Sequence, residues 1–269
     1  MNAVGQLGLH YEVAGHGSPV ILSHAGIADS GMWDPQWEAF PRSHRVVRYD
    51  IRGFGRSPLS PGRYSPPADL IALLDELVLG PAALVGASMG GGISLQVAVA
   101  RPDLVSALVL VGSGMRGHEW SDFVTRAWSE EEAAFDRGDL DAAVEVNLRT
   151  WVDGPDRSAG DVDPEVRRKV GEMQRRALEL FRDGGADAQE EALVLDIGER
   201  LGEISVPTLV IVGELDAPDI HQVADQLEHE IPQARRATIE GTAHVPSMER
   251  PDEFDRLVLE FLAEVEAGQ

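Results

Sequence analysis

The chain has 269 residues, of which 43% are hydrophobic and 26% charged, and this composition excludes collagen-like, rod-like and disordered proteins. Its 23 basic and 46 acidic residues give a net charge of −23, which disfavours binding to nucleic acids and to anionic membranes. The absence of cysteine excludes disulfides, thiolate nucleophiles, sulfur-ligated zinc and iron–sulfur clusters.

The N-terminal segment has no basic stretch followed by an apolar run, and no stretch approaches the length of a membrane span, so we expect a cytoplasmic protein. After it, short apolar runs alternate with longer amphipathic ones. This alternation predicts an α/β fold with a mostly parallel central sheet and helices on both faces. The predicted strands are Pro19–Ser23, Arg45–Asp50, Ala82–Gly86, Leu104–Gly112, Pro207–Gly213 and Ala234–Glu240.

Helices are predicted where apolar residues recur at intervals of three and four, after Pro66 and after Pro251. The stretch 117–201 breaks the alternation because it is rich in helix-forming sequence and strand-poor. We therefore predict a core formed by residues 1–116 and 202–269, with 117–201 inserted as a helical cap.

The sequence Gly86-Ala87-Ser88-Met89-Gly90 lies between a predicted strand and a predicted helix. In this context Gly-x-Ser-x-Gly is a nucleophile elbow, a sharp turn whose flanking glycines let strand and helix approach and expose the serine hydroxyl. Ser88 is therefore the candidate nucleophile. The Met89 N–H, at the start of the helix, is a candidate oxyanion donor.

A nucleophilic serine needs a base and an acid that orients the base, and after this turn they follow in the order Ser, Asp, His. Asp216 follows the predicted strand that ends at Gly213, and His244 lies on a loop after the next strand. We expect Asp216 as the acid, with Asp219 as its rival and Glu214 a weaker one. Asp219 is instead expected to cap the helix that follows it.

These segments, together with His24-Ala25-Gly26 and Asp50-Ile51-Arg52-Gly53-Phe54-Gly55, resemble the α/β-hydrolase fold proteins of the 3-oxoadipate enol-lactonase and esterase group. The resemblance covers nearly the whole core and only loosely the cap. It implies that Gly26 supplies the second oxyanion donor, with Ile27 a lesser candidate, and that His24 has a structural role. This chain has His24-Ala25 where the family usually has His-Gly.

Loops and insertions over a sheet normally provide the substrate contacts. Large apolar side chains of the cap and of strand ends are therefore candidates for the pocket, although most in the cap should form its own core. The candidates are Ile27, Trp33, Met115, Trp120, Trp128, Trp151 and Val245.

The resulting prediction is a serine hydrolase that cleaves an ester or lactone of a small, largely apolar substrate, without cofactor or metal. Carbon–carbon bond hydrolysis, cofactor-free perhydrolysis and a slow-turnover ligand receptor are the alternatives that the same residues leave open. A dinucleotide site at Gly53–Gly55 is disfavoured because Pro58 stands where a third glycine would be. Whether the chain forms homo-oligomers is also open.

Overall fold

The computed structural model of the chain describes residues 2–4, 8–185 and 187–268. Residues 1, 5–7 and 269 of the predicted core and residue 186 of the predicted cap lie outside the described residues.

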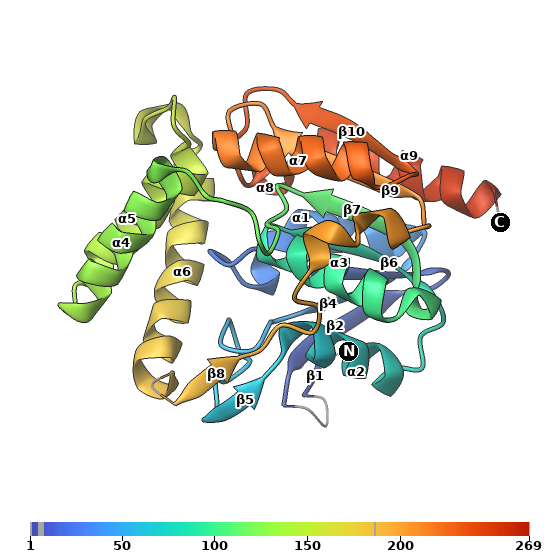
Figure 1. Ribbon diagram of the computed structural model, residues 1–269, viewed down its shortest axis with the longest axis horizontal. Helices are drawn as coiled ribbons and strands as arrows, with labels where there is room; N and C mark the ends of the chain where they lie inside the picture. The colour runs from blue at the N-terminus through green and yellow to red at the C-terminus, as the bar shows by residue number, and fades with distance from the viewer. Residues whose placement is uncertain (1, 5–7, 186, 269) are drawn as a thin grey trace.

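A sheet with the strand order β1-β2-β4-β3-β6-β7-β9-β10 forms the centre of the molecule (Figure 1). The pairs β1/β2 and β2/β4 are antiparallel, and the remaining pairs of this sheet are parallel. The sheet strands are β1 (Asn2–Val4), β2 (His10–Gly15), β3 (Pro19–Ser23), β4 (Arg45–Tyr49), β6 (Ala82–Ala87), β7 (Val105–Val111), β9 (Thr208–Gly213) and β10 (Ala234–Ile239). Two short strands, β5 (Gly62–Tyr64) and β8 (Ala188–Glu190), form a separate ribbon.

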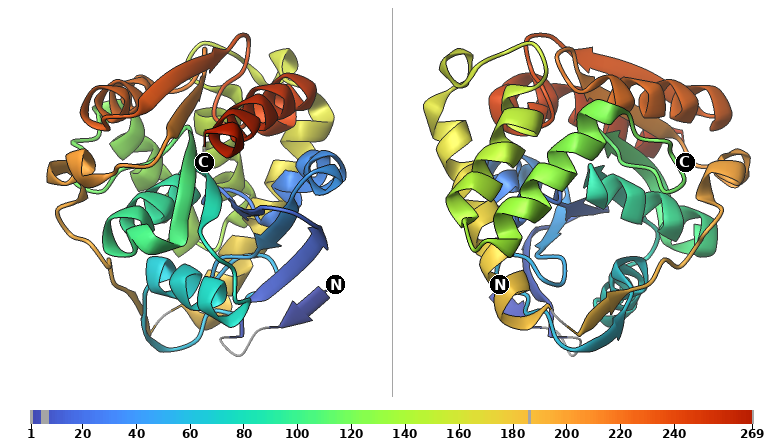
Figure 2. Two further views of the ribbon diagram at one scale, coloured as in Figure 1. Left: turned by 90° about the vertical axis from the view of Figure 1, so that its right-hand side faces the viewer. Right: turned by 60° about the vertical axis from the view of Figure 1, so that its left-hand side comes forward.

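Helices cover both faces of the sheet (Figure 2). One face carries α1 (Asp34–Ala39) and α9 (Pro251–Ala267), and the other carries α2 (Pro66–Glu76), α3 (Met89–Ala100) and α7 (Pro218–Glu230). A one-turn helix, α8 (Pro246–Glu249), precedes α9. The mostly parallel sheet with helices on both faces is the fold that the sequence predicted.

All six predicted strands are present, each within about one residue of its predicted ends. Four strands were not predicted, of which β1, β5 and β8 have three residues each and β2 has six. Every residue of β6 and of β9 is buried, because both strands have a parallel neighbour on each side and helices above and below. Continuous apolar runs are typical of such strands.

Three helices lie beyond the carboxyl ends of the strands: α4 (Asp122–Asp136), α5 (Leu140–Asn147) and α6 (Pro164–Gly184) (Figure 1). A π-helical turn, Leu148–Asp153, extends α5. This whole segment connects β7 to β9, which are hydrogen-bonded neighbours in the sheet. None of the helices in the described ranges is both long and apolar enough to cross a membrane.

Candidate active site

Ser88 lies in a strained turn between β6 and α3. Its φ of 49° is in the left-handed region, which residues other than glycine rarely adopt. The flanking glycines allow the strand and the helix to approach, since a Cβ on Gly86 would lie 2.3 Å from the Gly90 carbonyl oxygen, and one on Gly90 would lie 2.3 Å from that of Ser23. The turn is fixed by bonds from the Ser88 N–H to Val111 O (2.8 Å) and from the Gly114 N–H to Ser88 O (3.0 Å).

His244 and Asp216 form a buried hydrogen-bonded pair. His244 Nδ1 lies 2.9 and 3.1 Å from the two carboxylate oxygens of Asp216, and the two residues are only 2% and 4% exposed. Because Nδ1 faces a carboxylate, it carries the proton, and Nε2 is left free to accept one. The ring also packs against Trp151, at 4.7 Å between centroids.

The other two carboxylates near Asp216 have different partners. Asp219 does not cap α7, because the helix begins at Pro218 and places Asp219 in its first turn. Its carboxylate instead accepts hydrogen bonds from the Ser121 N–H (2.6 Å) and hydroxyl (2.7 Å), just before α4. Glu214 accepts one from the Gly241 N–H (2.9 Å).

The Gly26 and Met89 N–H groups are both without a hydrogen-bond acceptor in the described part of the chain. They lie near each other, since a Cβ on Gly26 would be 3.7 Å from Met89 Cβ. His24 holds the loop that carries Gly26: its Nδ1 donates to Ala25 O (2.8 Å), and its Nε2 accepts from the Ile51 N–H (2.9 Å). Burial lowers the pKa of His24, which favours this neutral form and a structural role.

A cavity of about 260 Å³ brings most of these groups together. Ser88 and His244 both line it, although no hydrogen bond joins their side chains in the described residues. Its lining is Gly26, Ile27, Ser88, Met89, Gly114, Trp120, Trp128, Glu131, Asn147, Trp151, Gln174, Ile220 and His244. Four of the candidate pocket residues, Ile27, Trp120, Trp128 and Trp151, are among them.

Three of the predicted pocket residues lie outside this cavity. Trp33 is fully buried in the core, where its ring packs 6.0 Å from that of Phe254. Met115 is buried beyond the end of β7, and Val245 is fully buried at the start of α8. Large apolar side chains near strand ends are more often packing residues than substrate contacts, and these three follow that rule.

Three polar lining residues, Glu131, Asn147 and Gln174, were not among the candidates. They come from α4, α5 and α6, respectively. The sequence does carry a signal for them, because each occupies a position on the apolar face of its helix. Which faces meet over Ser88 depends on how the helices pack, and no local pattern contains that information.

Arg157 connects the segment after the π-helical turn to the loop that carries His244. Its guanidinium donates to Val152 O (2.7 Å), to Gly241 O (2.9 Å) and to the Glu249 carboxylate (2.7 and 3.3 Å). Glu249 in turn accepts from the Ala243 N–H (2.8 Å). This ion pair, with both side chains at least nine-tenths buried, fixes the backbone on either side of the histidine.

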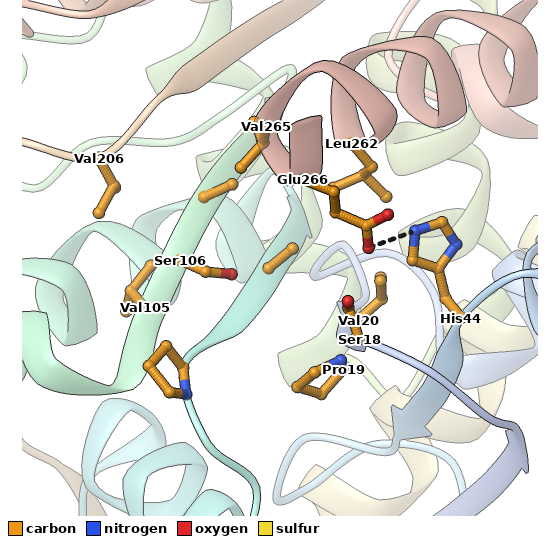
Figure 3. Close-up of a pocket in the computed structure, with 13 residues that line it drawn as sticks. Ser18, Pro19, Val20, His44, Val105, Ser106, Val206, Leu262, Val265 and Glu266 are labelled. Carbon is orange, nitrogen blue, oxygen red and sulfur yellow. Dashed lines mark ion pairs between the residues drawn. The ribbon is translucent and has the colours of Figure 1, made fainter. Parts of the chain in front are cut away.

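A second cavity, of about 450 Å³, lies at the opposite edge of the sheet beneath α9 (Figure 3). It is lined mainly by apolar residues at the starts of β3, β6 and β7, and the imidazole of His44 lies 3.4 Å from Glu266 there. It shares no lining residue with the Ser88 cavity. No group of three or more His, Asp or Glu side chains suited to a metal ion is present in the described ranges.

Comparisons with known proteins give consistent results. A family model described as "alpha/beta hydrolase fold" matches residues 18–251. The chain is 31% identical to a Variovorax paradoxus protein named "Putative carbamate hydrolase RutD", over 96% of this chain and 97% of that one. Among solved structures, a thermophilic esterase from Thermogutta terrifontis has 26% identity and a TM-score of 0.77, covering 98% of both chains. An enol-lactonase from Burkholderia xenovorans LB400 has 25% identity and a TM-score of 0.76, covering 98% of this chain and all of that one.

Proposed function

Because this chain belongs to the α/β hydrolase fold family, we propose that it is a serine hydrolase that cleaves a carboxylic ester or lactone of a small substrate. One observation carries the proposal: Ser88, in its strained turn, lines the same cavity as His244. The Nδ1 atom of His244 is hydrogen-bonded to buried Asp216, which leaves Nε2 available to accept a proton. The cavity volume of about 260 Å³ favours a small substrate.

In this mechanism Ser88 Oγ attacks the substrate carbonyl carbon while His244 Nε2 takes the hydroxyl proton. The Gly26 and Met89 N–H groups donate to the oxyanion that forms, and the negative carboxylate of Asp216 stabilises the imidazolium. The imidazolium then protonates the leaving alkoxide, which leaves an acyl-enzyme. A water molecule, deprotonated by His244, hydrolyses the acyl-enzyme and releases the acid.

The lack of a hydrogen bond between Ser88 and His244 is compatible with this role, since such bonds are often long in the absence of substrate. Two pre-positioned N–H donors support acyl transfer in particular, because they would stabilise a tetrahedral oxyanion. Removing one such donor costs roughly a hundred- to a thousandfold in rate in comparable sites. We further propose residues 1–116 and 202–269 as the core and 117–201 as a cap over this cavity.

The test is hydrolysis of p-nitrophenyl esters of increasing acyl length by the wild type and by Ser88→Ala. We expect multiple turnovers by the wild type, fastest with short acyl groups, and a loss of at least about a thousandfold in the variant, since the nucleophile is gone. A wild type that binds esters without turnover and is not labelled by a fluorophosphonate would contradict the proposal and favour a receptor.

A further inference from the structure

Each helix over the cavity carries one polar residue on its otherwise apolar face. On α4, Glu131 lies seven positions after Val124 and four after Ala127, both of which are buried. On α5, Asn147 lies seven positions after Leu140 and three after Val144. On α6, Gln174 lies among buried Val170, Met173, Ala177 and Leu178. Residues spaced in this way share one face of a helix.

The three side chains meet in the wall of the Ser88 cavity. Gln174 Nε2 donates to Glu131 Oε1 (3.3 Å), while Asn147, beside them in the cavity wall, donates through Nδ2 to Ala143 O (3.1 Å). Asn147 and Gln174 are each only 4% exposed. Glu131 is partly buried. Burying polar groups lowers stability unless they are satisfied, so the convergence of these three side chains needs a reason beyond packing.

The cluster has more acceptors than donors. Gln174 Oε1 is buried and has no hydrogen-bond partner. No arginine, lysine or histidine in the described part of the chain forms an ion pair with Glu131. Burial raises the pKa of Glu131 because no nearby cation offsets the loss of water. A ligand that supplies a hydrogen-bond donor, and especially a positive charge, would satisfy both groups.

The surroundings of Glu131 favour a cation. Trp128, one turn earlier on α4, lines the same cavity, and its indole face is of the kind that attracts ammonium groups. Gly26, Trp128, Glu131 and Gln174 also line an outer cavity of about 470 Å³. Glu131 and Gln174 therefore lie where the Ser88 cavity adjoins the outer cavity. One end of a substrate whose carbonyl lies at Ser88 would contact them there.

We propose that Glu131, Asn147 and Gln174 form a subsite for a protonated amino group of the substrate, so that amino esters or amino lactones are preferred over their neutral counterparts. The ammonium N–H donates to the Glu131 carboxylate or to Gln174 Oε1, while the ester carbonyl lies at Ser88. This inference rests on the proposed hydrolase function and adds the chemical class of the substrate.

The experiment compares esters that differ only in whether a dimethylamino group is replaced by its carbon isostere, an isopropyl group. One pair is ethyl γ-(dimethylamino)butyrate and its isostere, and the other is dimethylaminopropyl acetate and its isostere, so the amine is on the acyl side or on the alcohol side. Each kcat/KM is divided by the alkaline hydrolysis rate of the same ester, which removes differences in intrinsic reactivity.

In the wild type we expect the corrected kcat/KM of the amino ester to exceed that of its isostere by at least about tenfold in one of the pairs. A partly buried hydrogen bond to a charged group stabilises by enough to give a rate difference of this size. Glu131→Gln keeps the shape and removes the charge, and it should reduce that preference about tenfold. The matched control is Glu130→Gln on the solvent side of the same helix, where Glu130 pairs with Arg149. It removes the same charge and should leave the preference within about twofold.

A wild type with no preference in either pair, or a preference that Glu131→Gln retains, would overturn the subsite. If Glu131→Gln does not fold by circular dichroism, Gln174→Leu, which removes the unpartnered carbonyl, should lower the same preference. A separate result would contradict the proposed hydrolase function: the wild type does not hydrolyse the neutral esters, or Ser88→Ala hydrolyses them equally fast. Ser88-dependent turnover of neutral esters without amine preference refutes the subsite alone.

Discussion

Gly112, at the end of β7, leaves the space that the His244–Asp216 pair occupies. A Cβ at this position would lie 3.2 Å from both Asp216 Oδ2 and His244 Nδ1. Its φ of 48° is also one that only glycine adopts readily. The His244 and Asp216 side chains can therefore occupy their positions only because residue 112 has no side chain.

If His244 and Asp216 act as proposed, replacing Gly112 with alanine should lower kcat/KM by at least about tenfold, because small displacements of catalytic groups are costly. The matched control is Gly117→Ala. Gly117 has a φ of 87°, and a Cβ there would meet no atom within 4 Å, so this variant shares the backbone strain, about 1–2 kcal/mol, without the clash. Steady-state kinetics and urea unfolding of both variants separate the two effects. Equal losses of activity would show that strain alone is responsible.

How far the site was predictable differs from residue to residue. Ser88, Asp216 and His244 could be assigned as candidates because each follows a strand that the sequence predicts, and the carboxyl ends of parallel strands share one edge. Trp33 lies in the core rather than in the cavity wall, because a position near a strand end does not determine which way a side chain packs. Glu131 was not a candidate because its place in the cavity wall depends on contacts between helices that are far apart in sequence.

At the scale of elements, the π-helical turn and the His244 loop are held together by the Arg157–Glu249 pair. A buried ion pair is costly to break from one side, because the remaining charge stays in a poorly solvated place. Arg157 also donates to the carbonyl of Gly241, three residues before the histidine. Stability and catalysis should therefore both depend on it.

Arg157→Leu should lower the free energy of unfolding by about 3–5 kcal/mol and reduce kcat more than it changes KM. The control is Arg168→Leu on the exposed face of α6, where Arg168 pairs with Glu165 and Glu172. Exposed ion pairs contribute little to stability, so this change should leave the free energy of unfolding nearly unchanged. Chemical denaturation and kinetics on the same preparations provide both measurements. A neutral Arg157→Leu would mean that the His244 loop holds its position unaided.

The strands also differ in how well the sequence predicted them. The strands β6 and β9 were predicted from apolar runs that reflect burial on both faces. The strand β2 was missed because its burial decreases toward Gly15 and its sequence mixes polar and apolar residues. The strands β5 and β8 have three residues each and pair only with each other, so tertiary contacts rather than sequence pattern determine them.

At the scale of the whole molecule, several buried groups link stability to pH. Burial lowers the pKa of His10, His24 and His44. Below about pH 6.5 the unfolded chain therefore binds more protons than the folded one, and stability should fall as the pH decreases. Glu131, Glu190 and Asp255 have raised pKa values and act in the opposite direction.

The contribution of one histidine can be isolated by comparing the wild type with His44→Gln. Between pH 7 and pH 5 the free energy of unfolding of the wild type should decrease more steeply, by at most about 1.4 kcal/mol per pH unit. Urea titrations across this range provide the measurement. The two slopes should converge above pH 7, where His44 is neutral in both states. Parallel curves over the whole range would show that His44 is not protonated on unfolding.

The direct pairing of β7 with β9 has a consequence for how such a molecule can change over generations. The segment between them, with all three helices over the cavity, begins and ends on adjacent strands about 4.8 Å apart. Its length and sequence can therefore be altered without shifting any strand, provided that the contacts of Arg157 to the His244 loop are kept. An ancestral scaffold could acquire a new substrate range by exchanging this one insert while retaining its chemistry.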